Sequence, residues 1–145
     1  MHEFESIETS VITKLEAIEG LKTISSYSGQ LNVDEIERIT FQFPCIYVVA
    51  NTLKQTDFNR VSKYEIDFSL IVGDRNVRGS KASARGDTSS PGVYGLLENI
   101  RELIHNKKMM AGWSPAKLID EHPIIYLPEY HICVYSATYK MSNIK

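Results

Sequence analysis

The side chains best suited to bind a metal ion or to transfer a proton are four histidines: His2, His105, His122 and His131. Zinc sites place His and Cys ligands at short, regular intervals, and these histidines lack that spacing. His131 and Cys133 would share one face of a strand, but two residues do not make a metal site. The pattern therefore predicts no metal centre and favours solvated or hydrogen-bonded imidazoles.

Paired carboxylates are a second source of chemistry, because two neighbouring acids can act as general acid and general base. Glu65 and Asp67 form one such pair, and Asp120 and Glu121 form another. Strand alternation places Glu65 and Asp67 on a solvated face, which favours ordinary surface charge. The sequence also lacks the nucleophile-elbow, phosphate-loop, dinucleotide and H-E-x-x-H motifs. We therefore predict no catalytic, cofactor-binding or metal-binding residues, and we expect a protein that is not an enzyme.

A long polar segment at about 74–90 carries the cations Arg75, Arg78, Lys81 and Arg85. Loops of more than about 12 to 15 residues are uncommon in compact domains and are usually functional or disordered, so we predict a long flexible loop here. It could contact phosphate or an acidic protein surface, and a merely solvated loop explains the same composition. No aromatic side chain lies in it to stack on bases, so we expect no sequence-specific nucleic-acid binding.

Two amphipathic helices are predicted to support these residues. Apolar residues recur at helical spacing over 3–19, just before Gly20, and again from 91 to about 106, after Ser90 as an N-cap. Each stretch has one apolar stripe opposite charged residues. Both helices are therefore expected to pack one face against a sheet.

The strands are predicted from alternation and from apolar runs. Residues 63–72 alternate strictly, which indicates one buried and one polar face, and residues 45–50 are apolar on both faces, as in a central strand. The polar segment 51–62 would join these two strands as a long hairpin. Further strands are expected at 21–28, 124–127 and 130–140, whereas 31–40 fits neither period and is left as irregular or a short helix.

Consecutive strands with segregated helices predict an α+β fold. We expect a single domain over residues 1–145, with an antiparallel or mixed sheet of about four to five strands and two main helices packed on one face. Cys45 and Cys133 lie in apolar runs and are expected to be buried as small hydrophobic residues rather than joined in a disulfide.

Composition restricts the environment and the partners. The 16 basic and 18 acidic residues leave a net charge of -2, so no overall field attracts nucleic acid or an anionic membrane. No apolar run approaches the roughly 18 residues that span a bilayer. The first residues include Glu3, Glu5 and Glu8 instead of the positive charge of a signal peptide, so a cytoplasmic protein is expected.

Several segments of the sequence carry a resemblance to a known family. They are the end of the first helix at Glu19-Gly20-Leu21, the run Phe43-Pro44-Cys45-Ile46-Tyr47-Val48, the strand 64–72, the segment 92–104, and the closing strand 130–139. In their order and in their residue types, these segments resemble the tail terminator, or tail completion, proteins of Mu-like phages and prophages. The similarity is one of core positions and lengths over most of the chain.

The resemblance implies a structural protein that forms a ring of six subunits. Such a ring caps the tail tube and joins the tail to the head-side connector, with tail tube protein as a partner and sheath and connector proteins as further candidates. It would assemble in the cytoplasm of the bacterial host and end in a virion or phage-like tail particle, with no cofactor and no membrane contact. Because closed rings use two different patches of each subunit, we hypothesise interface roles for Lys63, Glu65, Asp67, Arg75, Arg78, Lys81 and Arg85.

Other functions remain open from the sequence. The first is another neck or minor tail component, such as a head-tail joining protein. A second, from a different class, is a small-molecule-binding or catalytic α+β domain that uses scattered Tyr, His and carboxylate side chains. Nucleic-acid binding is the third, and salt-sensitive affinity for DNA would be its signature.

Overall fold

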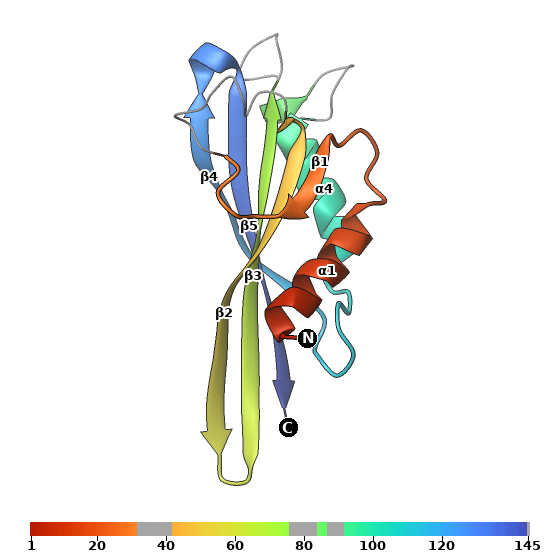
Figure 1. Cartoon of the computed structure of the whole chain (residues 1–145), viewed down its shortest axis with the longest axis vertical. Helices are drawn as coiled ribbons and strands as arrows, with labels where there is room; N and C mark the ends of the chain where they lie inside the picture. The colour runs from red at the N-terminus through yellow and green to blue at the C-terminus, as the bar shows by residue number, and fades with distance from the viewer. Residues whose placement is uncertain (32–41, 76–83, 87–91, 145) are drawn as a thin grey trace.

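A computed structural model describes residues 1–31, 42–75, 84–86 and 92–144 of the chain, and these form a five-stranded mixed sheet with two helices on one side (Figure 1). This arrangement confirms the predicted α+β fold and the predicted order of the elements. The elements are α1 (Glu3–Leu15), β1 (Thr23–Ser26), β2 (Cys45–Phe58), β3 (Val61–Arg75), α4 (Gly92–Ile104), β4 (Lys117–Leu127), the 3-10 turn η3 (Pro128–Tyr130) and β5 (Ile132–Ile144).

The strands lie in the order β1-β2-β3-β5-β4. β1 runs parallel to β2 over a short stretch, from Thr23 opposite Cys45 to Ser26 opposite Val48, and the other neighbouring pairs are antiparallel. β3 is therefore central, while β4 forms one edge. α4 packs mainly against the central strand, whereas α1 packs against β2 and β1.

The main core lies between the helices and one face of the sheet. The alternating residues of β3 point into it: Ile66, Phe68, Leu70 and Val72 are all fully buried, as the sequence predicts. Each such side chain contributes about 1.5–3 kcal/mol through removal from water. The helices contribute stripes to the same core, namely Ile7, Val11 and Leu15 from α1 and Val93, Leu96, Leu97, Ile100 and Ile104 from α4.

A second, smaller cluster covers part of the opposite face of the sheet. Cys45 and Tyr47 of β2 pack there with Ile71 of β3 and with Ile132 and Val134 of β5. The run 45–50 is thus apolar on both sides, as predicted, because each side has its own core. Both cysteines are free and buried, and burial raises the pKa of the Cys45 thiol to about 12.

β2 and β3 form a hairpin that extends well beyond both helices (Figure 1). Its last pair, Phe58 opposite Val61, encloses a two-residue turn, and Asn59 there has a φ of 50°, which Asn tolerates better than most residues. The predicted long hairpin is confirmed, but the predicted connector 51–62 is wrong. Most of it is strand, because the ladder with β3 holds residues of which only Leu53 packs against the core.

Three further boundaries differ from the predictions. α1 ends at Leu15 and not at 19, because Glu16 caps it by donating to the Ile12 carbonyl and the chain then turns, with the Ile18 amide bonded to the Leu15 carbonyl. β4 begins at Lys117 and not at 124, since an edge strand tolerates polar residues on its open side.

The third difference concerns the predicted loop and the closing strand. Asp74 is 1% exposed and belongs to β3, as does Arg75, so the strand is longer than expected. Tyr130 lies in the η3 turn and not in the last strand. Residues 76–83 and 87–90 of the predicted loop, Pro91 at the predicted start of the second helix, and 32–40 of the segment predicted as irregular or a short helix lie outside the described residues.

Candidate assembly interface

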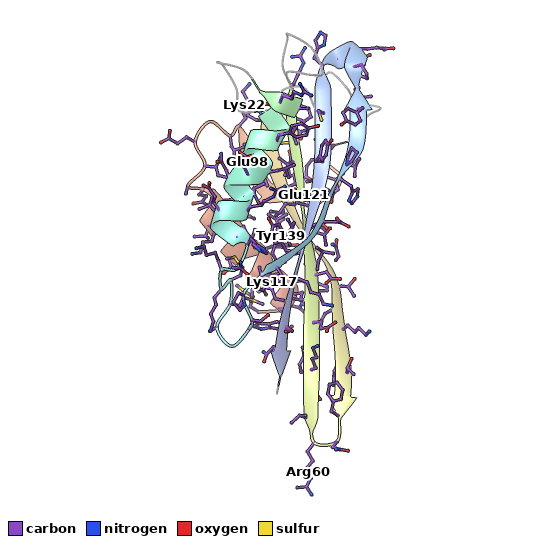
Figure 2. All side chains as sticks on the ribbon, turned by 180° about the vertical axis from the view of Figure 1, so that it is seen from behind. Lys22, Arg60, Glu98, Lys117, Glu121 and Tyr139 are labelled. Atoms are coloured by element: carbon purple, nitrogen blue, oxygen red, sulfur yellow. The ribbon has the colours of Figure 1, made fainter. Side chains whose placement is uncertain are left out.

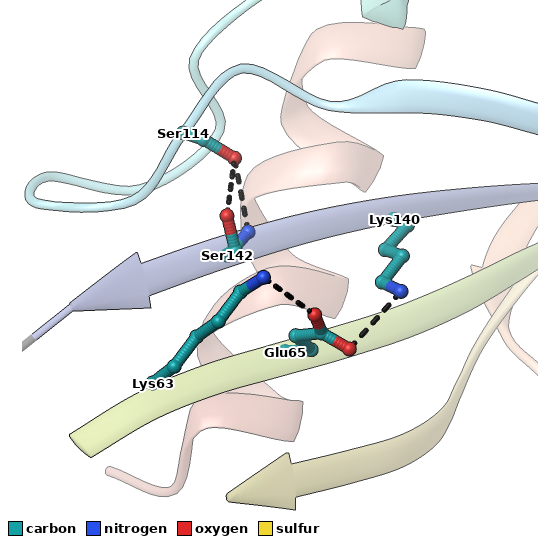
Figure 3. A network of polar contacts seen from close by, with 5 residues as sticks. All are labelled: Lys63, Glu65, Ser114, Lys140 and Ser142. Atoms are coloured by element: carbon teal, nitrogen blue, oxygen red, sulfur yellow. Dashed lines mark hydrogen bonds and ion pairs between the residues drawn. The ribbon is translucent and has the colours of Figure 1, made fainter. Parts of the chain in front are cut away.

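The strand residues predicted for the interface share one polar face of β3. Lys63 Nζ lies 3.0 Å from one carboxylate oxygen of Glu65, and Lys140 Nζ of β5 lies 3.0 Å from the other (Figure 3). The hydrogen bond from Lys63, followed by that from Lys140, holds the pKa of Glu65 below its ordinary value. Asp67 is on the same face, directly opposite Lys140 in the strand register. The charges of this group therefore balance within one chain.

The same face continues as a ladder of neutral polar side chains. Asn51 Nδ2 donates to Ser69 Oγ at 2.6 Å, and Ser69 Oγ lies 3.0 Å from Thr138 Oγ1. Sequence reasoning missed Asn51, Thr138 and Lys140. Alternation along the closing strand contains the signal for the last two, because both take positions that face away from the buried Tyr139.

The arginines predicted for the interface lie elsewhere. Arg75 ends β3 at the far end from Lys63, and its Nε donates to the Tyr130 carbonyl at 3.2 Å. Arg85 follows the buried Ala84, in a short helical turn close to the start of α4. The structure therefore separates Arg75 from the Lys63 group and does not unite the predicted residues in one patch. Arg78 and Lys81 lie outside the described residues.

The end of the β2–β3 hairpin is a surface that the sequence reading overlooked. Phe58 is 52% exposed and Val61 is 45% exposed, and Arg60 lies at the end of the hairpin between them (Figure 2). Just behind them, Asp57 accepts hydrogen bonds from Gln55 and Ser62, which brace the turn and lower the pKa of Asp57. The signal in the sequence was two large apolar residues flanking Asn59 in an otherwise polar segment.

A group of tyrosines forms another exposed patch near the edge strand β4. The Tyr126 and Tyr135 hydroxyls are 2.8 Å apart, and the Tyr94 hydroxyl is 3.3 Å from that of Tyr135. The rings meet edge to face at 5.7 and 6.2 Å. The hydrogen bond with Tyr126 is the main cause that raises the pKa of Tyr135. Tyr94 and Tyr126 are 42% and 49% exposed, so the patch offers aromatic surface for a contact.

The second predicted pair of acids, Asp120 and Glu121, has local structural partners. Arg101 of α4 bonds the carboxylate of Glu121 on β4, and His122 Nδ1 lies 3.2 Å from Asp120, so the two acids of that pair face different partners. Within the described parts of the chain, no three His, Cys, Asp or Glu side chains gather as a metal site. No described helix combines the length and the apolar composition that a membrane crossing requires.

The histidines follow the prediction with one exception. His2 Nδ1 accepts the Phe4 amide at 3.0 Å and caps α1, while His105 Nδ1 accepts the Leu118 amide at 3.1 Å. His131 is different: its Nδ1 is buried without a hydrogen-bond partner among the described residues. It occupies a left-handed position, with a φ of 60°, between η3 and β5, so the turn geometry and not a polar contact determines where the ring lies.

These surfaces are suited to protein contacts, and the comparison with known families agrees. The model of the family described as Bacteriophage Mu, Gp37 matches residues 3–142. The chain belongs to this family. Membership of the Gp37 family identifies a Mu-like phage protein and indicates a structural, tail-related role, which confirms the relation that the sequence suggested. Among curated proteins, none matches the chain.

Proposed function

We propose that the chain is a tail terminator subunit, which assembles into a ring of about six copies on the end of the tail tube. In that position the ring contacts the tail tube protein on one side and the head-side connector on the other, with the sheath as a further neighbour. The role is structural and not enzymatic. Assembly takes place in the cytoplasm of the bacterial host, and the ring remains in the finished tail. Membership of the Gp37 family supports the proposal.

The observation that carries the proposal is the projecting β2–β3 hairpin. β1 pairs with β2 only as far as Val48, and β5 pairs with β3 only as far as Lys63. Beyond Lys63, the end of the hairpin therefore consists of β2 and β3 alone. A two-stranded hairpin is marginally stable in water by itself. A neighbouring subunit that covers it would stabilise it, and ring contacts of this kind join two different patches of the same chain.

The polar face of β3 suits a solvated contact in such a ring. Lys63 and Lys140 offset Glu65 and Asp67. Lys54 lies opposite Glu65 in the strand register and adds one further cation, so the face presents charges of both signs to another copy. Arg75 and Arg85 lie nearer the other end of the sheet, where they are proposed to contact an acidic surface of a partner. The two groups of predicted interface residues would then serve two different contacts.

Mass and shape of the purified protein test this function. Size exclusion with light scattering and negative-stain microscopy should show closed rings of one size, and rings should be retained on isolated tail tubes. The double change Arg75→Ala and Arg85→Ala should weaken binding to a partner while the rings and the circular dichroism spectrum stay unchanged. A protein that stays a single subunit at high concentration and does not bind tail tubes would contradict the proposal.

A neck component of another kind is distinguished by the partner that it binds. A tail terminator should bind tail tube protein in a pull-down without any head protein present. A head-tail joining protein should bind the connector and leave tail tubes uncapped. The same pull-down with Lys22→Ala, a change on an exposed residue outside the proposed contacts, serves as the matched control.

A further inference from the structure

A shallow groove lies between α1 and the loop that follows α4. Glu3 and Thr13 of α1 form one wall, and Met109, Met110 and Trp113 line the other side. Met109 and Trp113 are largely buried, while Met110 is partly exposed and Ala111 is exposed. The groove thus presents sulfur and aromatic surface beside α1, with the carboxylate of Glu3 near one end of that helix and the ammonium of Lys14 near the other.

Hydrogen bonds fix the loop that forms this groove. Ser10 Oγ donates to the Met109 carbonyl at 2.5 Å, which joins the loop to α1. On the other side, the Ser114 amide donates to the Ser142 carbonyl at 2.7 Å, and the Ser142 amide donates back to Ser114 Oγ at 2.9 Å (Figure 3). Because the groove is built before anything binds, little ordering entropy opposes an occupant.

We infer that this groove receives the β2–β3 hairpin tip of a neighbouring copy, meaning Phe58, Arg60 and Val61 of that copy. The inference rests on the proposed ring. Phe58 and Val61 match the apolar floor, where methionine adapts its shape and favours aromatic partners. Arg60 lies between them and pairs with Glu3 at the rim of the groove. Tip and groove therefore agree in apolar surface, and Arg60 is proposed to approach the Glu3 end of α1 and not the Lys14 end, which carries a positive charge.

The geometry places these two surfaces so that they serve different neighbours. The hairpin extends past the helices and carries its tip away from the body of its own subunit, whereas the groove lies on the helix side of that body (Figures 1 and 2). Two distinct, complementary patches on one chain are what a closed ring requires. The contact also buries the exposed apolar pair at the tip, and buried aromatic anchors commonly carry most of the energy of an interface.

Site-directed cross-linking tests the contact. In the variant with Asn59→Cys and Ala111→Cys, which keeps Phe58 and Met110 in place, a bismaleimide reagent should link successive subunits into a ladder on a denaturing gel. The native Cys45 and Cys133 are buried and should not react. Each single variant should give no ladder, and Lys54→Cys with Ala111→Cys, which moves the thiol along β2 away from the tip, is the matched control.

The outcomes separate this inference from the proposed function. Rings together with a ladder support both. Rings without a ladder overturn the docking and leave the terminator function standing, and they would point to the edge strand β4 as the ring contact. A protein without rings and without a ladder overturns the docking and removes the support for the function.

A charge swap gives a second test that does not depend on cross-linking. Arg60→Glu should raise the concentration needed for half-assembly about fivefold or more, as expected for a surface ion pair turned into a repulsion. Combining it with Glu3→Arg should restore most of the loss. Lys22→Glu, on an exposed residue outside the proposed contacts, should have little effect. Equal loss in the single and double variants, with an unchanged melting temperature, would exclude the Arg60–Glu3 pairing.

Discussion

Phe58 and Val61 are direct partners across the turn that ends the β2–β3 hairpin, and both side chains remain about half exposed. They lie beyond the last pairs that β1 and β5 make with the hairpin, and half of their surface stays in water, so they contribute little to folding. Large apolar residues at a projecting end are more useful to a partner than to the fold. Substitutions of Phe58 and Val61 are therefore expected to weaken assembly and to leave the stability of the folded subunit nearly unchanged.

Phe58 and Phe68 occupy the same sheet but should differ greatly in their effect on stability. Phe58→Ala should change the free energy of unfolding by less than about 0.5 kcal/mol, because the ring is already in water. Phe68→Ala should cost about 3–5 kcal/mol, because its fully buried ring stacks on Tyr139 at 5.6 Å. Urea unfolding of both variants measures the difference. Equal losses would show that the hairpin tip is buried within the subunit.

Glu65 should titrate below its ordinary pKa, because Lys63 and Lys140 donate to its charged form. The stabilisation that follows is fully present above the ordinary pKa of the unfolded chain and is lost as the pH falls through the lower pKa of the folded state. Carbon NMR of the Glu65 carboxyl measures this. Lys63→Met should raise that pKa most, Lys140→Met less, and the distant Lys22→Met not at all. A carboxyl that titrates normally in the unmodified protein would contradict the network.

Alanine substitutions at Gly92 and Gly20 test the close packing at the start of α4, with Gly20 as the control. Both have positive φ, at 71° and 85°. A Cβ at Gly92 would lie 2.2 Å from the Gly86 nitrogen and 2.8 Å from the Ala84 carbonyl oxygen, whereas a Cβ at Gly20 meets nothing within 4 Å. Gly20→Ala should cost about 1 kcal/mol from backbone strain alone. Gly92→Ala should cost at least about twice that in urea unfolding, and equal costs would show that 84–86 does not pack there.

Tyr139 and Tyr135 should respond in opposite directions to loss of the hydroxyl. The Tyr139 hydroxyl is buried without a hydrogen-bond partner among the described residues, and burial raises its pKa. Tyr139→Phe removes this unpaired group and should stabilise the fold by about 1 kcal/mol. Tyr135→Phe breaks the bonds to Tyr126 and Tyr94 and should cost about 0.5 kcal/mol. Thermal unfolding distinguishes them, and a destabilised Tyr139→Phe variant would indicate a partner for the hydroxyl.

The sequence predicts the parts of the fold that face the core. Alternation over 63–72 and the helical stripe of α4 each identify side chains that are buried in the structure. The projecting half of the hairpin was not predictable in this way, because within 51–58 only Leu53 packs against the core and the ladder orders the exposed residues. The first half of β4 was not predicted for the same reason, because it is an edge strand with polar side chains.

The candidate interface was only partly predictable. The sequence places Lys63, Glu65 and Asp67 on one face of a strand, and the structure agrees. It could not show that Lys140, distant in sequence, neutralises Glu65 from the next strand, since strand order is decided by tertiary packing. Nor could it show that Arg75 lies far from this group along the same strand.

The mass of the purified, unmodified protein tests the central claim most directly. Light scattering coupled to size exclusion should give one species of about six times the 16.5 kDa chain, stable to dilution and seen as closed rings by negative stain. Ring closure predicts a single discrete size with no ladder of larger species. A mass that stays at one chain up to high concentration, with no rings on tail tubes, would contradict the account.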